Sequence, residues 1–299
     1  MSEVTEVNST MEYKSKECKT TEGQMPEADK VKKKSFFKKH PIGGAIAAMA
    51  LTWLFGTVLT IIPVVVAMAK GNDPKNIAQQ EYLPCIILEA VIVLLFYCKV
   101  SKKQLKDFFS PAGTGRGILM GWSVLIFVIV GAIISLTDGM VVGNAASSIA
   151  LALVAGIGEE LLFRLVPLNV VMDANAGRRT TVIGCVVTSV IFGLAHSTNL
   201  IRGADPTATL LQVIYAAGIG LLFAGIYVKT KNIWVTMILH TFVDFMSFIL
   251  VTDPTQQVTG VLSQAMSTRD VIITVIGTVI YFINAIMVLR TISDTKSAE

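Results

Sequence analysis

Apolar residues gather along the chain in eight long runs separated by short polar segments. Most runs are long enough for a helix that crosses a hydrocarbon core of about 30 Å. The runs cover residues 42–69, 83–98, 117–136, 145–171, 182–200, 208–228, 233–251 and 271–289. We find no internal repeat, and the connecting segments are short. The pattern predicts an all-α fold, a polytopic transmembrane helical bundle of about eight spans.

Composition agrees with this prediction. Of the 299 residues, 53% are hydrophobic and only 15% are charged, whereas soluble domains have about one quarter charged residues. The composition therefore indicates an integral, multi-pass membrane protein and gives no reason to expect a nucleic-acid partner.

The first 40 residues differ from the rest. They hold nine of the 25 Lys and Arg together with seven acidic residues, and few apolar residues cluster there. Such a composition is typical of a disordered chain. We therefore divide the sequence into a disordered, charged cytoplasmic tail (1–40), a membrane bundle (41–291) and a short second tail (292–299).

The distribution of basic residues predicts the orientation of the bundle. If the amino terminus is cytoplasmic, eight spans place 20 of the 25 Lys and Arg in cytoplasmic segments and four in outside loops. Arg164 lies inside the fourth run. This asymmetry is the one expected from the positive-inside rule, and it predicts that both termini are cytoplasmic.

Ionisable residues inside a span are costly and usually face the bundle interior, where they find partners. Glu160 and Arg164 are four residues apart, so they share a helix face and can pair. Glu159 is rotated away from that face by about 100°, which leaves its carboxylate available. The other ionisable residues in the runs are Glu89, His196, His240 and Asp244. Glu89 has no evident partner, and we expect a structural or cavity-facing role for it.

The polar residues of the fourth, fifth and seventh runs could meet in the bundle, and two kinds of chemistry are then open. Imidazole and carboxylate groups could bind a metal such as zinc. Alternatively, a Glu and a His could deprotonate water while a second His polarises a carbonyl. Possible metal ligands are Glu159, His196, His240 and Asp244. The cofactor is left open between zinc and none, because the chain has no HExxH motif.

Three motifs carry a family resemblance. They are "EELLFR" (Glu159, Glu160 and Arg164), "FGLAH" (Phe192 to His196) and "HTFVD" (His240 to Asp244), which occur in this order on three separate runs. They resemble the EExxxR, FxxxH and HxxxN/D motifs of the CPBP (CAAX protease and bacteriocin-processing) family. This family of intramembrane proteases includes CAAX prenyl endopeptidases and lysostaphin resistance protein A-like proteins. The resemblance covers about residues 145–250.

The resemblance implies roles for individual residues. Glu159 would activate water with help from His196, and His240 and Asp244 would complete the catalytic site. Glu160, paired with Arg164, would orient the helix that carries the site, and Phe192 would pack beside His196. The family often has Asn where this chain has Asp244. Because an ionised Asp cannot donate a hydrogen bond, we expect Asp244 to orient His240 or bind a metal.

The function implied is an intramembrane endopeptidase that acts on a membrane-associated, lipidated or secreted-precursor peptide, such as a bacteriocin precursor. Its partners would be that peptide and the lipid bilayer, in a bacterial cell membrane. Two alternatives from other classes stay open. Intramembrane Glu, His and Asp also build proton- or ion-coupled secondary transporters, although we see no repeated halves of the kind that carriers show. The chain could also be a catalytically silent membrane scaffold.

Overall fold

The computed structural model describes residues 36–73, 77, 79–109, 111–201, 203–252 and 266–293. All of them belong to one compact unit, residues 35–299. The predicted tail lies outside the described residues up to residue 35, and its end forms helix α1 (Phe36–Lys39). Residues 294–299 of the second tail also lie outside the described residues.

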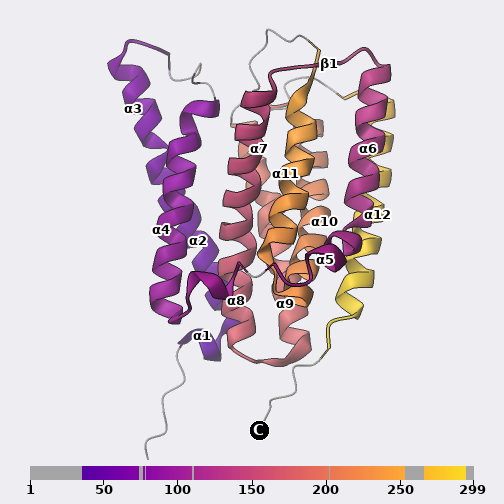
Figure 1. Ribbon diagram of the computed structural model, residues 1–299. Helices are drawn as coiled ribbons and strands as arrows, with labels where there is room; N and C mark the ends of the chain where they lie inside the picture. Colours follow the sequence, from indigo (N-terminus) through magenta and orange to yellow (C-terminus); the bar gives the residue numbers. More distant parts are fainter. Residues whose placement is uncertain are drawn as a thin grey trace, which may run out of the picture. The chain divides into compact units, whose positions relative to one another are not determined.

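Helices occupy all eight predicted runs (Figure 1). The first run forms α2 and α3, and the second forms α4. The third forms α5 and α6, the fourth forms α7, a π-helical turn and α8, and the fifth forms α9 and a 3₁₀ turn. The last three runs each form one helix. The bounds are α2 Pro41–Leu59, α3 Ile61–Ala69, α4 Leu83–Ser101, α5 Thr114–Met120, α6 Trp122–Thr137, α7 Ala145–Glu160, the π turn Leu161–Leu165, α8 Val166–Asp173, α9 Gly177–Ala195, the 3₁₀ turn His196–Leu200, α10 Pro206–Thr230, α11 Ile233–Ile249 and α12 Thr268–Arg290.

Among the described residues, two further 3₁₀ turns and one pair of short strands connect the helices. The turns are Gln79–Tyr82 and Leu105–Asp107. Strand β1 (Val141–Val142) pairs antiparallel with β2 (Leu250–Val251), with Val141 opposite Val251. The seventh run therefore leaves the helical conformation two residues before its predicted end.

The all-α polytopic bundle is confirmed, whereas the count of eight spans stays a prediction. In the described part of the chain, five helical segments are long and apolar enough to cross a membrane, and a sixth is added if α5 and α6, bent by 63°, form one span. α11 is apolar but has only 17 residues, a length of about 26 Å. The fourth run is interrupted by the π turn directly after Glu160. The location of the termini also stays a prediction.

Helix α10 is the centre of the bundle. It packs against α9 and α12 along most of its length, and Leu222, Phe223 and Ile226 are fully buried. A helix that is apolar all round and buried is expected at the core. The outer helices instead expose large apolar side chains, such as Phe96 of α4. These exposed side chains match a surface that faces lipid.

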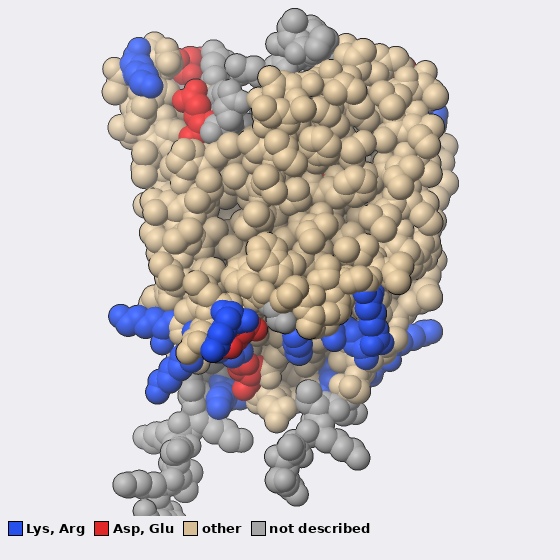
Figure 2. Space-filling view, in the orientation of Figure 1, with Lys and Arg blue, Asp and Glu red and all other residues tan. Residues whose placement is uncertain are grey.

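Charged residues gather mainly at the ends of the bundle (Figure 2). Most described Lys and Arg lie near the ends of α4, α8, α10 and α12 and the starts of α2 and α9. We call the end of the bundle where these helix termini lie the basic end. The band between the two ends shows almost no charge on the visible face. This distribution agrees with an integral membrane protein whose bundle crosses the bilayer.

Candidate active site

The site is built around the end of α7, where two small residues allow close helix packing. A Cβ at Gly156 would collide with Thr241 of α11, and a Cβ at Gly158 would lie 3.2 Å from Ile86 of α4. Small residues let helix backbones approach in this way. α7 therefore runs close against α11, and the carboxylates of Glu159 and Glu160 lie at the level of His240.

Glu160 is fully buried and holds two partners with one oxygen. Its Oε1 lies 3.2 Å from Nη1 of Arg164 and 2.8 Å from Nδ1 of His240. The pairing of Glu160 with Arg164 confirms the prediction from their spacing. The contact with His240 was not predicted, and it makes Glu160 the residue that fixes the orientation of this imidazole.

The guanidinium of Arg164 lies over an aromatic ring. Its central carbon is 3.8 Å from the centre of the Phe192 ring. Its Nη2 has no hydrogen-bond partner within the described residues. A cation placed over an aromatic face is stabilised by the ring quadrupole, more so where water is excluded. Phe192 therefore compensates part of the charge of Arg164, which is more than the packing role predicted for it.

The Phe192 ring also contacts both histidines. Its centre lies 5.0 Å from that of His196 and 5.9 Å from that of His240, edge-on in both cases. Phe163 of the π turn packs edge-on against the same ring at 5.2 Å. Phe192 is thus the common neighbour of Arg164, His196 and His240.

The second nitrogen of His240 lies between two carboxylates. Its Nε2 is 3.6 Å from Oε2 of Glu159 and 3.6 Å from Oδ2 of Asp244. Because Nδ1 faces the carboxylate of Glu160, we assign a proton to Nδ1, which donates it in that hydrogen bond. Nε2 is then the nitrogen that faces Glu159 and Asp244. From the sequence, Asp244 was expected to orient His240 or to bind a metal. In the structure Nδ1 donates its hydrogen bond to Glu160, and Asp244 lies beside Nε2 of the same ring.

Glu159 and Asp244 are more open than their neighbours. Their side chains are 33% and 21% exposed, whereas Glu160 is fully buried and Arg164 is 1% exposed. Sequence spacing predicts this split, since Glu159 is turned away from the face that holds Arg164. The two open carboxylates are the groups that a substrate or water could reach.

His196 is held differently from His240. It follows α9 directly, and its Nδ1 lies 3.0 Å from the carbonyl oxygen of Phe192, to which it donates. No ion pair of His196 with a carboxylate is found in the described part of the chain. The structure therefore places His240, rather than His196, in direct reach of Glu159.

The four possible metal ligands do not form a metal site in this arrangement. Among the described residues, no three His, Cys, Asp or Glu side chains are disposed to hold a metal ion together. The hydrogen bond from His196 to the backbone fixes that ring against Phe192 rather than against the carboxylates. We therefore derive no step of the reaction through a metal.

Two supporting residues were missed by the sequence analysis. A Cβ at Gly220 would lie 2.8 Å from Nη2 of Arg164 and 3.1 Å from Cδ1 of Phe192, so this glycine makes room for their stack. The Phe223 ring lies 5.7 Å from that of His240. Both residues lie in the segment "AAGIGLLFAG" of α10. Its regularly spaced small residues are typical of close helix packing and could have pointed to them.

The fold and the cluster together define a helical integral membrane protein with an intramembrane site of carboxylates and imidazoles. Residues 141–246 match the family model of the type II CAAX prenyl endopeptidase Rce1-like proteins. This segment includes every residue of the cluster, and the match confirms the resemblance to the CPBP and CAAX proteases there. It is a family of membrane-embedded proteases, so a peptide substrate and the bilayer follow in general terms. No curated protein and no solved structure matches the chain.

Proposed function

We propose that the chain is an intramembrane endopeptidase that hydrolyses a peptide bond with a water activated by Glu159. The observation that carries this proposal is the position of His240, whose Nε2 lies 3.6 Å from both Glu159 and Asp244 while Nδ1 is held by Glu160. Acyl transfer to water requires a general base and groups that stabilise the charge that develops. Here a carboxylate base, an oriented imidazole and a second carboxylate surround one point. The substrate would be a membrane-associated, lipidated or secreted-precursor peptide.

The proposed reaction begins at Glu159, the more exposed of the two adjacent glutamates. Its carboxylate accepts a proton from water, and the oxygen of that water attacks the carbonyl carbon of the scissile bond. When the C–N bond breaks, the same proton passes to the leaving amine. Removing a positioned general base lowers a rate by about 10²- to 10⁴-fold, which sets the size of effect to expect.

His240 would stabilise the oxyanion that forms on the attacked carbonyl. Its Nε2 donates a hydrogen bond when the ring carries both protons, and the carboxylates of Glu160 and Asp244 stabilise that charged ring. The Nδ1–H of His196 is engaged with the backbone, so its Nε2 is the nitrogen available to the substrate. Asp244 thus acts through its charge, and Glu160 acts through the orientation of His240.

The decisive experiment compares Glu159→Gln with Glu89→Gln in the purified, full-length protein. Both variants replace a helical glutamate with glutamine. Glu89 lies on α4, outside the segment 141–246 that matches the family model. We expect Glu159→Gln to lose at least about 10²-fold in the rate of peptide cleavage while it unfolds at the temperature of the wild type. Glu89→Gln should keep its activity. Full activity in Glu159→Gln would remove the proposed mechanism.

The substrate can be searched for in cells with the same pair of variants. Peptides that accumulate with Glu159→Gln, and not with Glu89→Gln, are candidate substrates. Synthetic versions with and without a lipid group would then show whether lipidation is needed. Dialysis of the wild type against a chelator belongs to the same assay. We expect no loss of cleavage, and a loss restored by zinc would replace the metal-free scheme.

A further inference from the structure

A large cavity lies between α2, α4 and α8. None of the residues that line it belongs to the proposed catalytic cluster, which comprises Glu159, Glu160, Arg164, His240 and Asp244. The volume of the cavity is about 680 Å³, within the range of about 300–1,000 Å³ that is usual for ligand sites. It extends along α4 from Ile92 to Ser101, a length of about 14 Å. This length is close to half of a hydrocarbon core of about 30 Å. The cavity therefore has the depth of one leaflet of a bilayer.

The walls of this cavity are apolar, and their few polar atoms are already engaged. Leu51 and Phe55 of α2, Phe96 of α4 and Val170 of α8 are among the lining residues. The hydroxyl of Thr52 donates to the carbonyl of Met49 at 2.9 Å, and that of Ser101 donates to the carbonyl of Tyr97 at 2.7 Å. A peptide backbone in this place would leave its N–H and C=O groups without partners, which is costly in an apolar medium. The buried part of an occupant should therefore be hydrocarbon.

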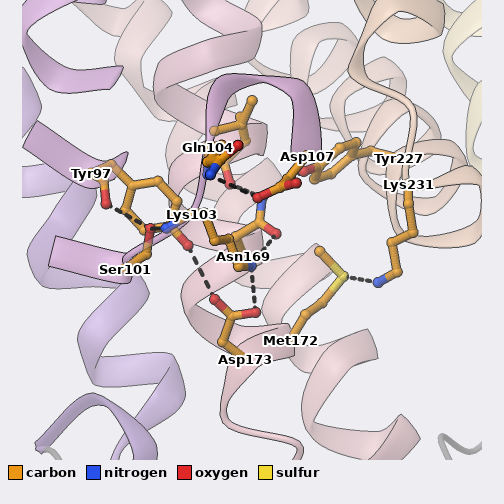
Figure 3. A network of polar contacts seen from close by, with 11 residues as sticks. Tyr97, Ser101, Lys103, Gln104, Asp107, Asn169, Met172, Asp173, Tyr227 and Lys231 are labelled. Carbon is orange, nitrogen blue, oxygen red and sulfur yellow. Dashed lines mark hydrogen bonds and ion pairs between the residues drawn. The ribbon is translucent and has the colours of Figure 1, made fainter. Parts of the chain in front are cut away.

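The rim of the cavity lies at the basic end and carries an excess of positive charge. Lys38, Lys103 and Asp173 line it. Nζ of Lys103 lies 2.6 Å from Oδ1 of Asp173. The other carboxylate oxygen of Asp173 accepts a hydrogen bond from the hydroxyl of Tyr97 at 3.4 Å. Figure 3 shows this network, in which Lys103 and Asp173 face one another across the gap between α4 and α8. Lys38 is exposed and forms no ion pair within the described residues, so its charge is available to a ligand.

From these observations we infer that the cavity binds one phospholipid with an anionic headgroup. The acyl chains fill the space between α2, α4 and α8, and the headgroup phosphate lies against Lys38 and Lys103. Clusters of Lys at the membrane surface attract anionic lipids in this way. The site is separate from the proposed proteolytic chemistry, because none of its lining residues is a member of the catalytic cluster.

The chain offers a matched pair of charge variants to test this inference. Lys38→Gln with Lys103→Gln removes the two lysines of the rim. Lys39→Gln with Lys99→Gln removes two nearby lysines, the first in α1 like Lys38 and the second in the last turn of α4, and neither of these lines the cavity. Both double variants change the net charge of the protein by the same amount. A general attraction between the basic end and the membrane would be reduced equally in both.

The experiment measures lipid retained by the delipidated, full-length protein in native mass spectrometry. Phosphatidylglycerol and phosphatidylcholine with identical acyl chains are the probes. We expect the wild type and Lys39→Gln/Lys99→Gln to retain at least five-fold more phosphatidylglycerol than phosphatidylcholine. We expect Lys38→Gln/Lys103→Gln to retain the two lipids equally. Equal retention of the two lipids by the wild type would overturn the inference, as would an equal loss in both double variants.

A second pair of variants tests the apolar part without changing any charge. Ala47 lines the cavity, whereas Ala50, one turn away on the same helix, is exposed and does not. Ala47→Leu should lower the retention of both lipids, and Ala50→Leu should leave it unchanged. This pair still tests the site if the rim variant fails to fold. If a lipidated peptide displaces phosphatidylglycerol and occupies the cavity more tightly, the phospholipid assignment is wrong.

Discussion

Two polar clusters each use residues of the segment from α7 to α8, and they differ in how their charges are compensated. The catalytic cluster comprises Glu159, Glu160, Arg164, His240 and Asp244. The basic-end network comprises Tyr97, Lys103, Asn169, Asp173 and Tyr227 (Figure 3). In the catalytic cluster three carboxylates face one arginine and one histidine. In the basic-end network one carboxylate faces one lysine.

In the basic-end network the carboxylate of Asp173 is paired with Lys103, and the amide group of Asn169 is satisfied as well. The Asn169 side chain donates to the carbonyl of Leu165 at 2.7 Å and to the hydroxyl of Tyr227, and it accepts from Lys103 at 3.3 Å. Such a network connects α4, α8 and α10 without leaving any reactive group. Even with His240 protonated, the catalytic cluster keeps one carboxylate in excess, and two of its carboxylates are partly exposed. From this difference we expect unbalanced charge inside a span, rather than charge as such, to mark a functional site.

The largest effect is expected from breaking the one balanced pair of the catalytic cluster. Arg164→Met leaves the fully buried carboxylate of Glu160 without its cation. Removing one partner of a buried ion pair typically costs about 3–5 kcal/mol. We expect a large fall in the yield of folded protein and in the unfolding temperature in detergent.

The double variant Glu160→Leu/Arg164→Met separates stability from activity. Without either charge no buried carboxylate is left uncompensated, so much of the lost stability should return. Cleavage should still be lost, because His240 no longer has the hydrogen bond to Glu160 that orients it. A double variant as unstable as Arg164→Met would mean that the pair matters for reasons other than charge compensation.

A smaller effect is expected from a methyl group placed against the stack of Arg164 and Phe192. Gly220→Ala puts a Cβ 2.8 Å from Nη2 of Arg164, so the guanidinium or the ring has to move. Overpacking of this kind costs about 1–3 kcal/mol, and cleavage should fall because Phe192 also contacts both histidines. The control is Gly131→Ala on α6, where a Cβ would meet nothing within 4 Å. An equal effect of the two variants on activity would show that the stack does not support the site.

The sequence predicts the helices and the residue types of the catalytic cluster well, because both follow from local spacing. Eight apolar runs correspond to helical segments, and the i,i+4 rule pairs Glu160 with Arg164. Spacing also identifies Glu159 as the more open carboxylate. The number of spans is harder to predict, since it depends on bends and interruptions such as the π turn after Glu160, which leave no clear trace in hydropathy.

The contacts between helices were not predictable in the same way. The hydrogen bond from His240 to Glu160 joins residues 80 positions apart, and it depends on how closely α7 approaches α11 at Gly156. Spacing on α11 places Asp244 on the same face as His240, and the structure has this pair. Spacing within one helix gives no information on the contact of His240 with Glu160 on α7. The distance between α7 and α11 determines which carboxylate lies beside which nitrogen of His240. This distance cannot be predicted from the pattern of residues within a single helix.

The smallest effect is expected at the basic-end network, and it completes the comparison. The side chains of Lys103 and Asp173 are 28% and 40% exposed, and ion pairs at such positions contribute about 0–1 kcal/mol. We expect Asp173→Asn to shift the unfolding temperature little and to leave cleavage unchanged, since Asn can still accept a hydrogen bond from Lys103. A double-mutant cycle with Lys103→Gln measures the coupling between the two side chains directly. A coupling as large as that between Glu160 and Arg164, or a loss of cleavage in Asp173→Asn, would show that the two clusters are one functional unit and that charge balance does not distinguish them.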